Sequence, residues 1–285
     1  DPPFVPGIEF SGVVERTGSK VRGIRKGDRV AGFSKQGSYA ELVCTEASHV
    51  VRLTAGMSFE VGAALPVAYL SAYHGLVTLA NAQKDEKLLI HAAAGGVGIA
   101  SIQIATHLGM EIFGTVGSDE KAKVAARAGA DHVINYRTED FSERVRERTN
   151  GYGLDVVMDS VGGSVLRKGW KLLAPMGRYV LYGFASVTGK GGLNRLKMYK
   201  EALKAPLIFP PFLPSRNVSL MGFNLYFLTH KKAYLERATK QIMAWYRKKI
   251  IKPLIGATFG FDEIVTAHEY LQTRQSVGKV VVKVS

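Results

Sequence analysis

The sequence has a single cysteine, Cys44, among its 285 residues. One cysteine excludes an internal disulfide and any zinc site that needs several cysteines. No apolar run reaches the roughly 18 residues of a membrane-spanning helix. The start, Asp1-Pro2-Pro3, lacks the basic and apolar pattern of a signal peptide. These absences favour a globular protein of a reducing compartment, and we expect a cytoplasmic location.

Acidic residues are scarce relative to basic ones. The chain has 24 Asp and Glu against 38 Lys and Arg, which gives a formal net charge of +14. Such an excess suits a phosphate-bearing cofactor, RNA or an acidic membrane, and its plainer interpretation is a solvated basic surface. The cations gather in residues 190–204 and 231–252. Charge alone does not choose among these partners.

The order of the predicted elements indicates an α/β fold. Residues 1–53 read as all-β, with strands at 8–14, 28–33, 38–43 and 49–53. Ser58 is the expected N-cap of a helix over 59–65, and Pro66 opens the next helix. Strands and helices then alternate. The expected strands are 88–90, 111–116, 132–136, 154–159, 178–183 and 218–223. This alternation predicts a doubly wound parallel sheet.

Two later stretches depart from that alternation. Residues 185–217 contain several glycines and prolines around a basic run, which predicts an excursion that is either a mobile flap or an ordinary surface insertion. Residues 231–249 carry an apolar stripe at helical spacing, which is typical of a helix packed on a core. The tail, residues 278–284, is expected to be a strand.

The glycine stretch at residues 93–98 is the main functional motif. Ala93, Gly95 and Gly98 occupy the three small positions of a G-x-G-x-x-G spacing between an apolar strand and an uninterrupted helix. Such a turn aims backbone N–H groups and the positive end of a helix at a pyrophosphate. A glycine cluster alone is more often a plain turn, but the flanking strand and helix favour dinucleotide binding.

The end of the second expected strand indicates which dinucleotide is bound. NAD sites usually place an Asp or Glu there to bind the adenosine ribose, and here the strand ends in Val116 without a carboxylate. Ser118 as a donor, Lys121 as a cation and Tyr136 as a hydroxyl favour the 2′-phosphate of NADPH. Taken singly, Lys121 could be an exposed helix lysine and Tyr136 a packing residue.

The chain resembles the medium-chain dehydrogenase/reductase superfamily, specifically its zinc-independent quinone oxidoreductase branch. The matching segments are residues 6–12, 26–30, 93–98, 114–116, 135–137, 159–163 and 277–281. Residues 171–177 and 251–255 are more similar to the vesicle-membrane type within this branch than to zeta-crystallin. The resemblance covers essentially the whole chain and is specific for the branch, but weak for the substrate.

This resemblance implies a Rossmann domain beside a GroES-like β domain built from both chain ends. The expected boundaries are 1–66 for the first part of the β domain, 67–224 for the Rossmann domain and 225–285 for the return. The implied NADPH ligands fall into three groups. Ala94, Gly95, Gly96, Val97 and Gly98 hold the pyrophosphate; Ser118, Lys121 and Tyr136 hold the 2′-phosphate; Ser71, Gly183, Phe184, Ala185 and Phe223 approach the nicotinamide half.

Two departures from the superfamily pattern matter. Zinc-dependent relatives have a metal-binding His where this chain has Ile8, and they use several cysteines, so we expect no metal. His49, His74 and His91 are not spaced as a metal set. Family members also have several dozen residues before the position of Pro6, including strands of the β domain, so we expect this chain to be truncated at its N-terminus.

The predicted function is an NADPH-dependent, zinc-free reductase that transfers hydride to a quinone or an α,β-unsaturated carbonyl. No residue stands out as a general acid, so the catalytic residues are left unassigned. One alternative is an enoyl-thioester reductase of the same superfamily. Another is a protein that keeps the fold and binds RNA or acidic membrane through its basic surface. The resemblance also implies a homodimer, formed through the edge strand 218–223.

Overall fold

The computed structural model describes residues 4–186, 188–189, 192–193, 200–201 and 203–284. It divides the chain into two compact units, Asp1–Ser71 with Leu225–Ser285, and Ala72–Asn224. The first boundary lies later than the expected position after residue 66, within a helix that runs on past it. Across the described residues, no helix combines the length and the apolarity that crossing a bilayer requires.

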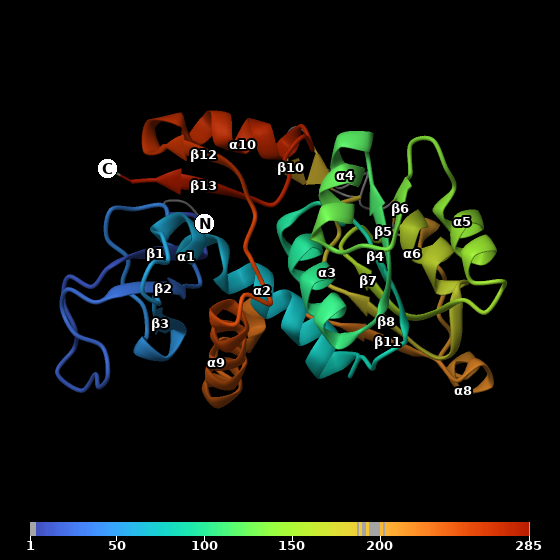
Figure 1. Cartoon of the computed structure of the whole chain (residues 1–285), viewed down its shortest axis with the longest axis horizontal. Coiled ribbons are helices and arrows are strands. Elements are labelled where there is room, and N and C mark those ends of the chain that lie inside the picture. The colour runs from blue at the N-terminus through green and yellow to red at the C-terminus, as the bar shows by residue number, and fades with distance from the viewer. Residues whose placement is uncertain (1–3, 187, 190–191, 194–199, 202, 285) are drawn as a thin grey trace. The chain divides into compact units, whose positions relative to one another are not determined.

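The second unit is built on a six-stranded parallel sheet in the order β11-β8-β7-β4-β5-β6. Its strands are β4 (Lys87–Ile90), β5 (Glu111–Val116), β6 (His132–Asn135), β7 (Leu154–Asp159), β8 (Leu173–Leu181) and β11 (Ser219–Gly222). Helices α3 (Gly96–Leu108) and α4 (Asp119–Ala128) cover one face, and α5 (Phe141–Arg148) and α6 (Ser164–Trp170) cover the other (Figure 1). Strand β7 is buried along its whole length, as expected for a sheet covered on both sides. The predicted doubly wound sheet is confirmed.

Local chemistry sets the ends of these elements. Ser118 accepts a hydrogen bond from the Lys121 amide at 3.3 Å and caps α4, and Gly129 ends that helix with a φ of 115°. The apolar side chains of α5 and α6 pack against the sheet in one cluster. It includes Leu89, Phe113, Phe141, Val145, Val157, Leu166 and Tyr179, all almost fully buried. This core packs against the strands whose carboxyl ends carry the loops of the candidate site.

Strand β8 differs from its prediction. We expected a strand over 178–183 after a turn at Pro175 and Gly177, but β8 begins at Leu173. Its pairing with β7 shifts from Leu154–Leu173 to Val156–Arg178, so the Pro-Gly segment bulges out of the ladder. Proline donates no ladder hydrogen bond, and Met176 takes a left-handed φ of 67° to complete the bulge.

The first unit combines both ends of the chain. Strands β1 (Glu9–Val13), β2 (Arg29–Phe33) and β3 (Val50–Arg52) form an antiparallel sheet, whereas β12 (Ile255–Gly260) and β13 (Lys279–Lys283) pair in parallel. The helices are α1 (Phe59–Ala64), α2 (Pro66–Tyr73), α9 (Lys232–Arg247) and α10 (Ile264–Gln272). Ion pairs Lys279–Glu9 and Lys283–Glu60 tie the last strand to the N-terminal segment. The hydrogen bond from Lys283 contributes most to lowering the pKa of Glu60, to about 2.

Three details of the predicted elements need correction or addition. The predicted strand 38–43 is wrong: the amides of Ser38 and Tyr39 bond to Gly7 and Pro6 in a bent segment, and Leu42 is 74% exposed. Strand β12 and helix α10 were not predicted at all. In the predicted excursion, residues 187, 190–191, 194–199 and 202 lie outside the described residues, so the flap interpretation stays a prediction. The described part includes the short strands β9 (Thr188–Gly189) and β10 (Gly192–Leu193), and helix α8 (Phe212–Arg216).

Candidate functional site

The glycine turn lies at the carboxyl end of β4, near the middle of the six-stranded sheet. The Ala93 amide donates to the Thr115 carbonyl of β5 at 3.0 Å, and Ala92 takes a left-handed φ of 54°. Helix α3 then begins behind Gly95, which has no side chain to cap the first-turn amides. Gly95, Gly96 and Val97 are half-buried, whereas Ala94 and Gly98 are buried. The turn therefore presents backbone donors and a positive helix end at its open side.

Gly98 is required by close packing inside this turn. A Cβ placed on Gly98 would lie 2.4 Å from the Ala92 carbonyl oxygen and 2.6 Å from that of Ala93. A Cβ on Gly95 would meet only the Ala92 oxygen, at 3.3 Å. The two glycines therefore have different roles. Gly98 lets helix α3 pack closely against the turn, and Gly95 leaves the open side of the turn accessible.

The three residues expected at the 2′-phosphate leave two neighbouring strands at the same edge of the sheet. Ser118 and Lys121 follow β5, and Tyr136 follows β6. The Tyr136 hydroxyl packs directly over Gly117, because a Cβ on Gly117 would lie 2.5 Å from the hydroxyl oxygen. Burial lowers the pKa of Lys121, and the nearby positive charge of Arg137 lowers it further. The side chains of this corner therefore form a small cationic and hydroxyl-bearing surface.

The residues expected near the nicotinamide follow the strands on the other side of β4. Gly183, Phe184 and Ala185 come after β8, where the Ala185 amide donates to the Ser160 carbonyl at 2.9 Å. Phe223 comes after β11 and stacks on Tyr182, with ring centroids 5.7 Å apart. Burial raises the pKa of Tyr182 well above its ordinary value, so this hydroxyl stays protonated in the physiological range.

The structure thus brings together twelve of the thirteen predicted ligands at the carboxyl edge of one sheet. The strand order puts the residues after β11 and β8 on one side of the glycine turn and those after β5 and β6 on the other. The sheet reverses its winding direction between β4 and β7, and ligands of doubly wound sheets bind at such a reversal. Ser71 is the exception, because it is the last residue of the first unit; its place beside the nicotinamide stays a prediction.

A buried polar network beneath this edge was not predicted from the sequence. Asp159, at the end of β7, accepts hydrogen bonds from the Val161 amide at 2.6 Å and the Tyr179 hydroxyl at 2.7 Å. His91 Nδ1 and Thr115 Oγ1 lie 2.9 Å apart, next to the glycine turn. Burial lowers the pKa of His91, against the opposing charge of Asp159. The available signal was a carboxylate directly after the apolar run Val156-Val157-Met158 of β7.

Among the described residues, no group of three or more His, Cys, Asp or Glu side chains is arranged to hold a metal ion. Cys44 is exposed. His49 instead packs on Phe33 and shares a 3.0 Å hydrogen bond with the Thr229 carbonyl, and His74 packs on Phe223. The contacts of His49 and His74 are therefore those of packing residues.

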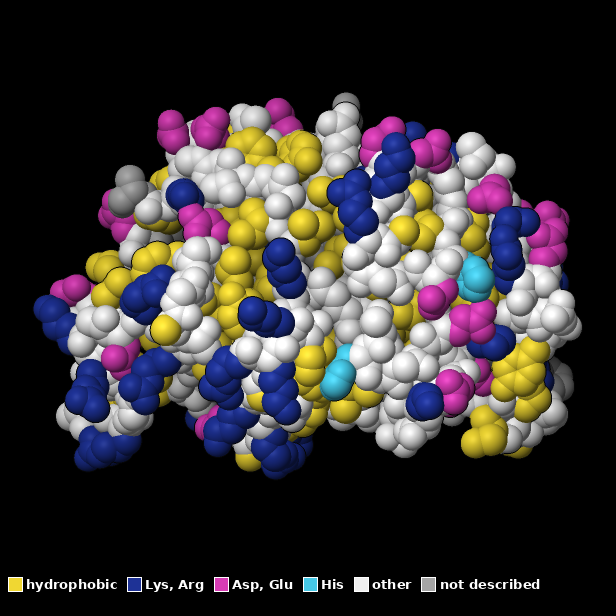
Figure 2. All heavy atoms as spheres, viewed as in Figure 1, with side chains coloured by type: hydrophobic (Ala, Val, Ile, Leu, Met, Phe, Trp, Pro, Cys, Tyr) yellow, Lys and Arg dark blue, Asp and Glu magenta, His cyan; other side chains and the backbone are white. Residues whose placement is uncertain are grey.

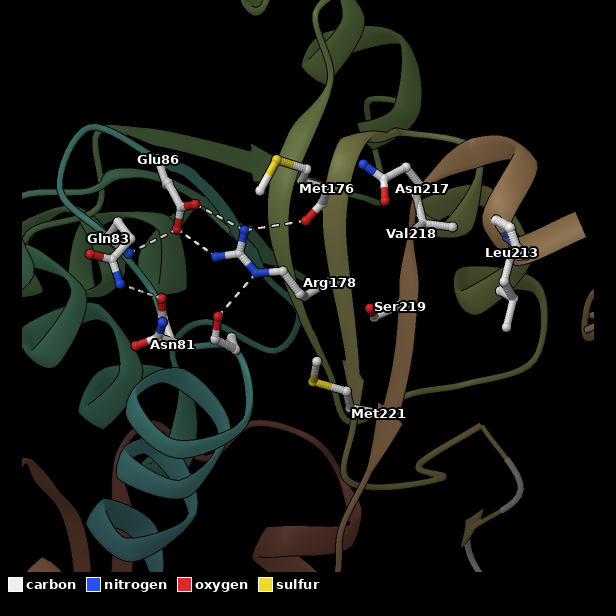
Figure 3. A pocket seen from close by; sticks show the side chains of 12 residues that line it. Asn81, Gln83, Glu86, Met176, Arg178, Leu213, Asn217, Val218, Ser219 and Met221 are labelled. Carbon is white, nitrogen blue, oxygen red and sulfur yellow. Dashed lines mark hydrogen bonds and ion pairs between the residues drawn. The ribbon is translucent and has the colours of Figure 1, made fainter.

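A hollow of the second unit lies at the opposite edge of the sheet. This cavity has a volume of about 620 Å³. Figure 3 shows its lining side chains, with Val218 and Ser219 beside the amino end of β11. Arg178 crosses it to Glu86, with Nη2 2.6 Å and Nη1 2.9 Å from the carboxylate oxygens. The glycine turn follows the carboxyl ends of the same parallel strands. The cavity is therefore separate from the predicted dinucleotide site.

Positive charge collects on the first unit. Figure 2 shows Lys and Arg side chains gathered over α9 and over the loop between β1 and β2. The exposed cations of α9 and the residues after it are Lys232, Arg237, Lys240, Arg247, Lys248, Lys249 and Lys252. Most of the other predicted basic cluster, residues 190–204, lies outside the described residues. Binding of RNA or acidic membrane stays a prediction, which a salt-sensitive association with heparin or acidic liposomes would test.

The fold and the site together define a class of protein. The family model described as "Zinc-binding dehydrogenase" matches residues 128–282, and the "Alcohol dehydrogenase GroES-like domain" model matches residues 1–55. The chain belongs to the medium-chain dehydrogenase/reductase superfamily, an oxidoreductase family.

Three relatives show the range of proteins to which this chain is similar. The chain is 35% identical over 281 residues to a zebrafish (Danio rerio) synaptic vesicle membrane protein VAT-1 homolog, covering 98% of this chain and 58% of that relative. An Escherichia coli quinone oxidoreductase complexed with NADPH is 30% identical with a TM-score of 0.84, over 99% of this chain and 84% of that one. The CurK enoyl reductase is 33% identical with a TM-score of 0.82, over 99% and 80%.

Proposed function

We propose that this chain is an NADPH-dependent reductase that delivers hydride to a quinone or an α,β-unsaturated carbonyl without zinc. The observation that carries the proposal is the edge of the sheet, where an uncapped glycine turn lies between a cationic corner and a second group of loops. Similarity to a quinone oxidoreductase that binds NADPH supports it. Because the chain spans 58% of the zebrafish relative, the activity of the whole protein is part of the proposal.

The residues present fit an NADPH molecule. The first-turn amides of α3 would hold the pyrophosphate, because they lack a side-chain cap and point away from the helix. Ser118, Lys121 and Tyr136 would hold the 2′-phosphate, since no carboxylate ends β5. The loops after β8 and β11 would position the nicotinamide half and shield it from water. Bound NADPH supplies the hydride, and the protein supplies orientation.

Zinc independence is inferred from residue chemistry. A catalytic zinc site uses three protein ligands, commonly His, Cys or Glu. This chain has Ile8 where zinc-dependent relatives have His, and its one cysteine is exposed. The matched family model is nevertheless named for zinc binding. Metal analysis of the purified protein tests the inference: we expect less than stoichiometric zinc and full NADPH binding after chelator treatment.

Two classes of acceptor fit the proposed reductase. Tyr69 and Tyr73 are candidates from the sequence to line the acceptor pocket, although tyrosines in such a Leu- and Ala-rich helix are more often core residues; Tyr69 is only 1% exposed and burial raises its pKa, as suits a core tyrosine. A quinone can take its protons from solvent, which is consistent with the lack of an assigned general acid. The similarity to the CurK enoyl reductase favours an enoyl thioester as the second candidate. Parallel assays with a quinone, an enone and an enoyl thioester distinguish these acceptors.

A homodimer through β11 is also proposed. This strand ends the sheet and exposes most of its residues, with Leu220 40% exposed. An unpaired strand edge can add a strand from a second copy. Light scattering on wild type and Leu220→Lys is the test: we expect a dimer that the lysine weakens. A cytoplasmic location remains a prediction from the cysteine content.

Nucleotide titration tests the cofactor assignment. We expect wild type to bind NADPH at least about tenfold more tightly than NADH, because a charge-assisted phosphate contact contributes about 1.5–3 kcal/mol. Lys121→Ala should weaken NADPH and leave NADH unchanged. Lys123→Ala, two residues along the same helix, is the matched control and should alter neither. Equal affinities of wild type for the two nucleotides would contradict the proposal.

A further inference from the structure

A buried hydrogen bond lies beneath the glycine turn. His91, which directly follows β4, and Thr115 of β5 are both almost fully buried. His91 Nδ1 and Thr115 Oγ1 lie 2.9 Å apart, so the two side chains join the ends of neighbouring strands. Neither residue belongs to the predicted cofactor ligands, and the contact is therefore separate from the ligands themselves.

The second ring nitrogen of His91 indicates that this residue does more than fill space. His91 Nε2 is buried and has no hydrogen-bond partner among the described residues. The ring packs nearly perpendicular to Phe141, with ring centroids 4.9 Å apart. An aromatic ring without nitrogens would make the same apolar contact and would avoid the cost of burying an unpaired nitrogen. The nitrogen that has a partner, Nδ1, is therefore the one to which a role belongs.

The hydrogen bond flanks a strained residue of the turn. Ala92 has a left-handed φ of 54°, a conformation that alanine rarely adopts and that persists only where the surroundings fix it. Thr115 bonds to both neighbours of Ala92. Its carbonyl oxygen accepts from the Ala93 amide at 3.0 Å, and its hydroxyl bonds to His91. The His91 amide also donates to the Met158 carbonyl at 3.0 Å, so Ala92 lies between two residues that are tied to the adjacent strands.

The position of Ala92 determines where α3 begins. The Ala92 carbonyl oxygen accepts from the Gly95 amide at 2.9 Å, and a Cβ on Gly98 would lie only 2.4 Å from the same oxygen. Movement of Ala92 must therefore move the first turn of α3, because the two are in close contact. The amides of this turn are the groups proposed to hold the pyrophosphate. A contact that fixes Ala92 thus also fixes the direction of these amides.

We propose that His91 and Thr115 are positioning residues of the dinucleotide site. Their hydrogen bond holds Ala92 in its left-handed conformation and so aims the first-turn amides of α3 at the pyrophosphate. This role rests on the proposed function, since it assumes that the glycine turn binds a dinucleotide. Loss of the bond should affect NADPH and NADH equally, because both carry the pyrophosphate. Loss of a 2′-phosphate ligand would instead affect NADPH alone.

Titrations of purified variants with NADPH, NADH and 2′-AMP test this role. His91→Phe keeps a ring but removes both nitrogens, and Thr115→Val keeps the branched shape but removes the hydroxyl. Thr115→Ser keeps the hydroxyl and is the rescue variant. Thr149→Val is the matched control, because it removes another buried hydroxyl of the same unit, which donates to the Val145 carbonyl at 2.8 Å. Thermal melting measures the stability of each variant separately.

We expect His91→Phe and Thr115→Val each to weaken NADPH and NADH about tenfold and 2′-AMP less than twofold, because 2′-AMP has no pyrophosphate. The double variant should also lose about tenfold and not a hundredfold, since both changes remove the same bond. Thr115→Ser should bind like wild type, and Thr149→Val should melt lower with unchanged affinities. Unchanged dinucleotide affinity of Thr115→Val, or equal weakening of 2′-AMP, overturns the positioning role and leaves the cofactor assignment intact. Wild type that binds neither dinucleotide overturns both.

Discussion

Replacing Gly98 with alanine tests the packing of the glycine turn most directly. The new Cβ would lie 2.4 and 2.6 Å from two carbonyl oxygens and 2.7 Å from the Ala93 carbonyl carbon, all in the backbone. Backbone atoms cannot rotate away as a side chain can, so the turn or the helix must move. Overpacking of this kind costs about 1–3 kcal/mol. Because all three contacts are to backbone atoms and shorter than 3.0 Å, we expect a cost in the upper part of this range, about 2–3 kcal/mol. The helical preference of alanine over glycine returns about 1 kcal/mol, so we expect a net loss of about 1–2 kcal/mol.

Thermal melting and nucleotide titration measure this effect. A loss of 1 kcal/mol lowers the melting temperature by about 2–4 °C in a domain of this size, so Gly98→Ala should melt about 2–8 °C below wild type. Displacement of the turn should weaken NADPH and NADH equally, unlike Lys121→Ala. Gly95→Ser is the stability control, because its Cβ meets one oxygen at 3.3 Å and serine is a good N-cap. A Gly98→Ala protein as stable as wild type would refute the argument.

Two further predictions concern groups outside the proposed ligands. His91 is buried, and burial lowers its pKa below the ordinary 6.5, so the unfolded chain binds a proton that the folded chain resists. The free energy of unfolding should therefore be highest above pH 6.5 and should decrease as the pH falls below 6.5, by up to about 1.4 kcal/mol per pH unit. Urea titrations of His91→Asn should show a smaller dependence of stability on pH. An unchanged pH dependence in this variant would contradict the role given to His91. Arg178→Met should lower the free energy of unfolding by about 1–3 kcal/mol, because Glu86 loses its ion-pair partner. The double variant with Glu86→Gln should recover part of that loss. Equal melting temperatures of wild type and Arg178→Met would contradict this account.

Much of the second unit could be predicted because its signals are local. Strand β5 coincides with its predicted range, because the apolar run that defines it lies within a few residues. The ends of α4 are also set locally, by the Ser118 cap and the Gly129 stop. The elements of the first unit were harder to predict from the sequence. A segment such as 38–43 has strand-like composition, but only a free sheet edge would make it a strand, and its amides bond to Gly7 and Pro6 instead.

The predicted site shows the same division between local and tertiary information. The sequence by itself determined the glycine turn, the missing carboxylate after β5 and the choice of Lys121 and Tyr136, because each depends on spacing along one strand–loop–helix unit. Only the tertiary structure decided which loops are neighbours, because strand order in a sheet is set by packing and not by chain order. That order placed the end of β6 beside the end of β5, and it put Asp159 and His91 in one buried layer beneath the turn.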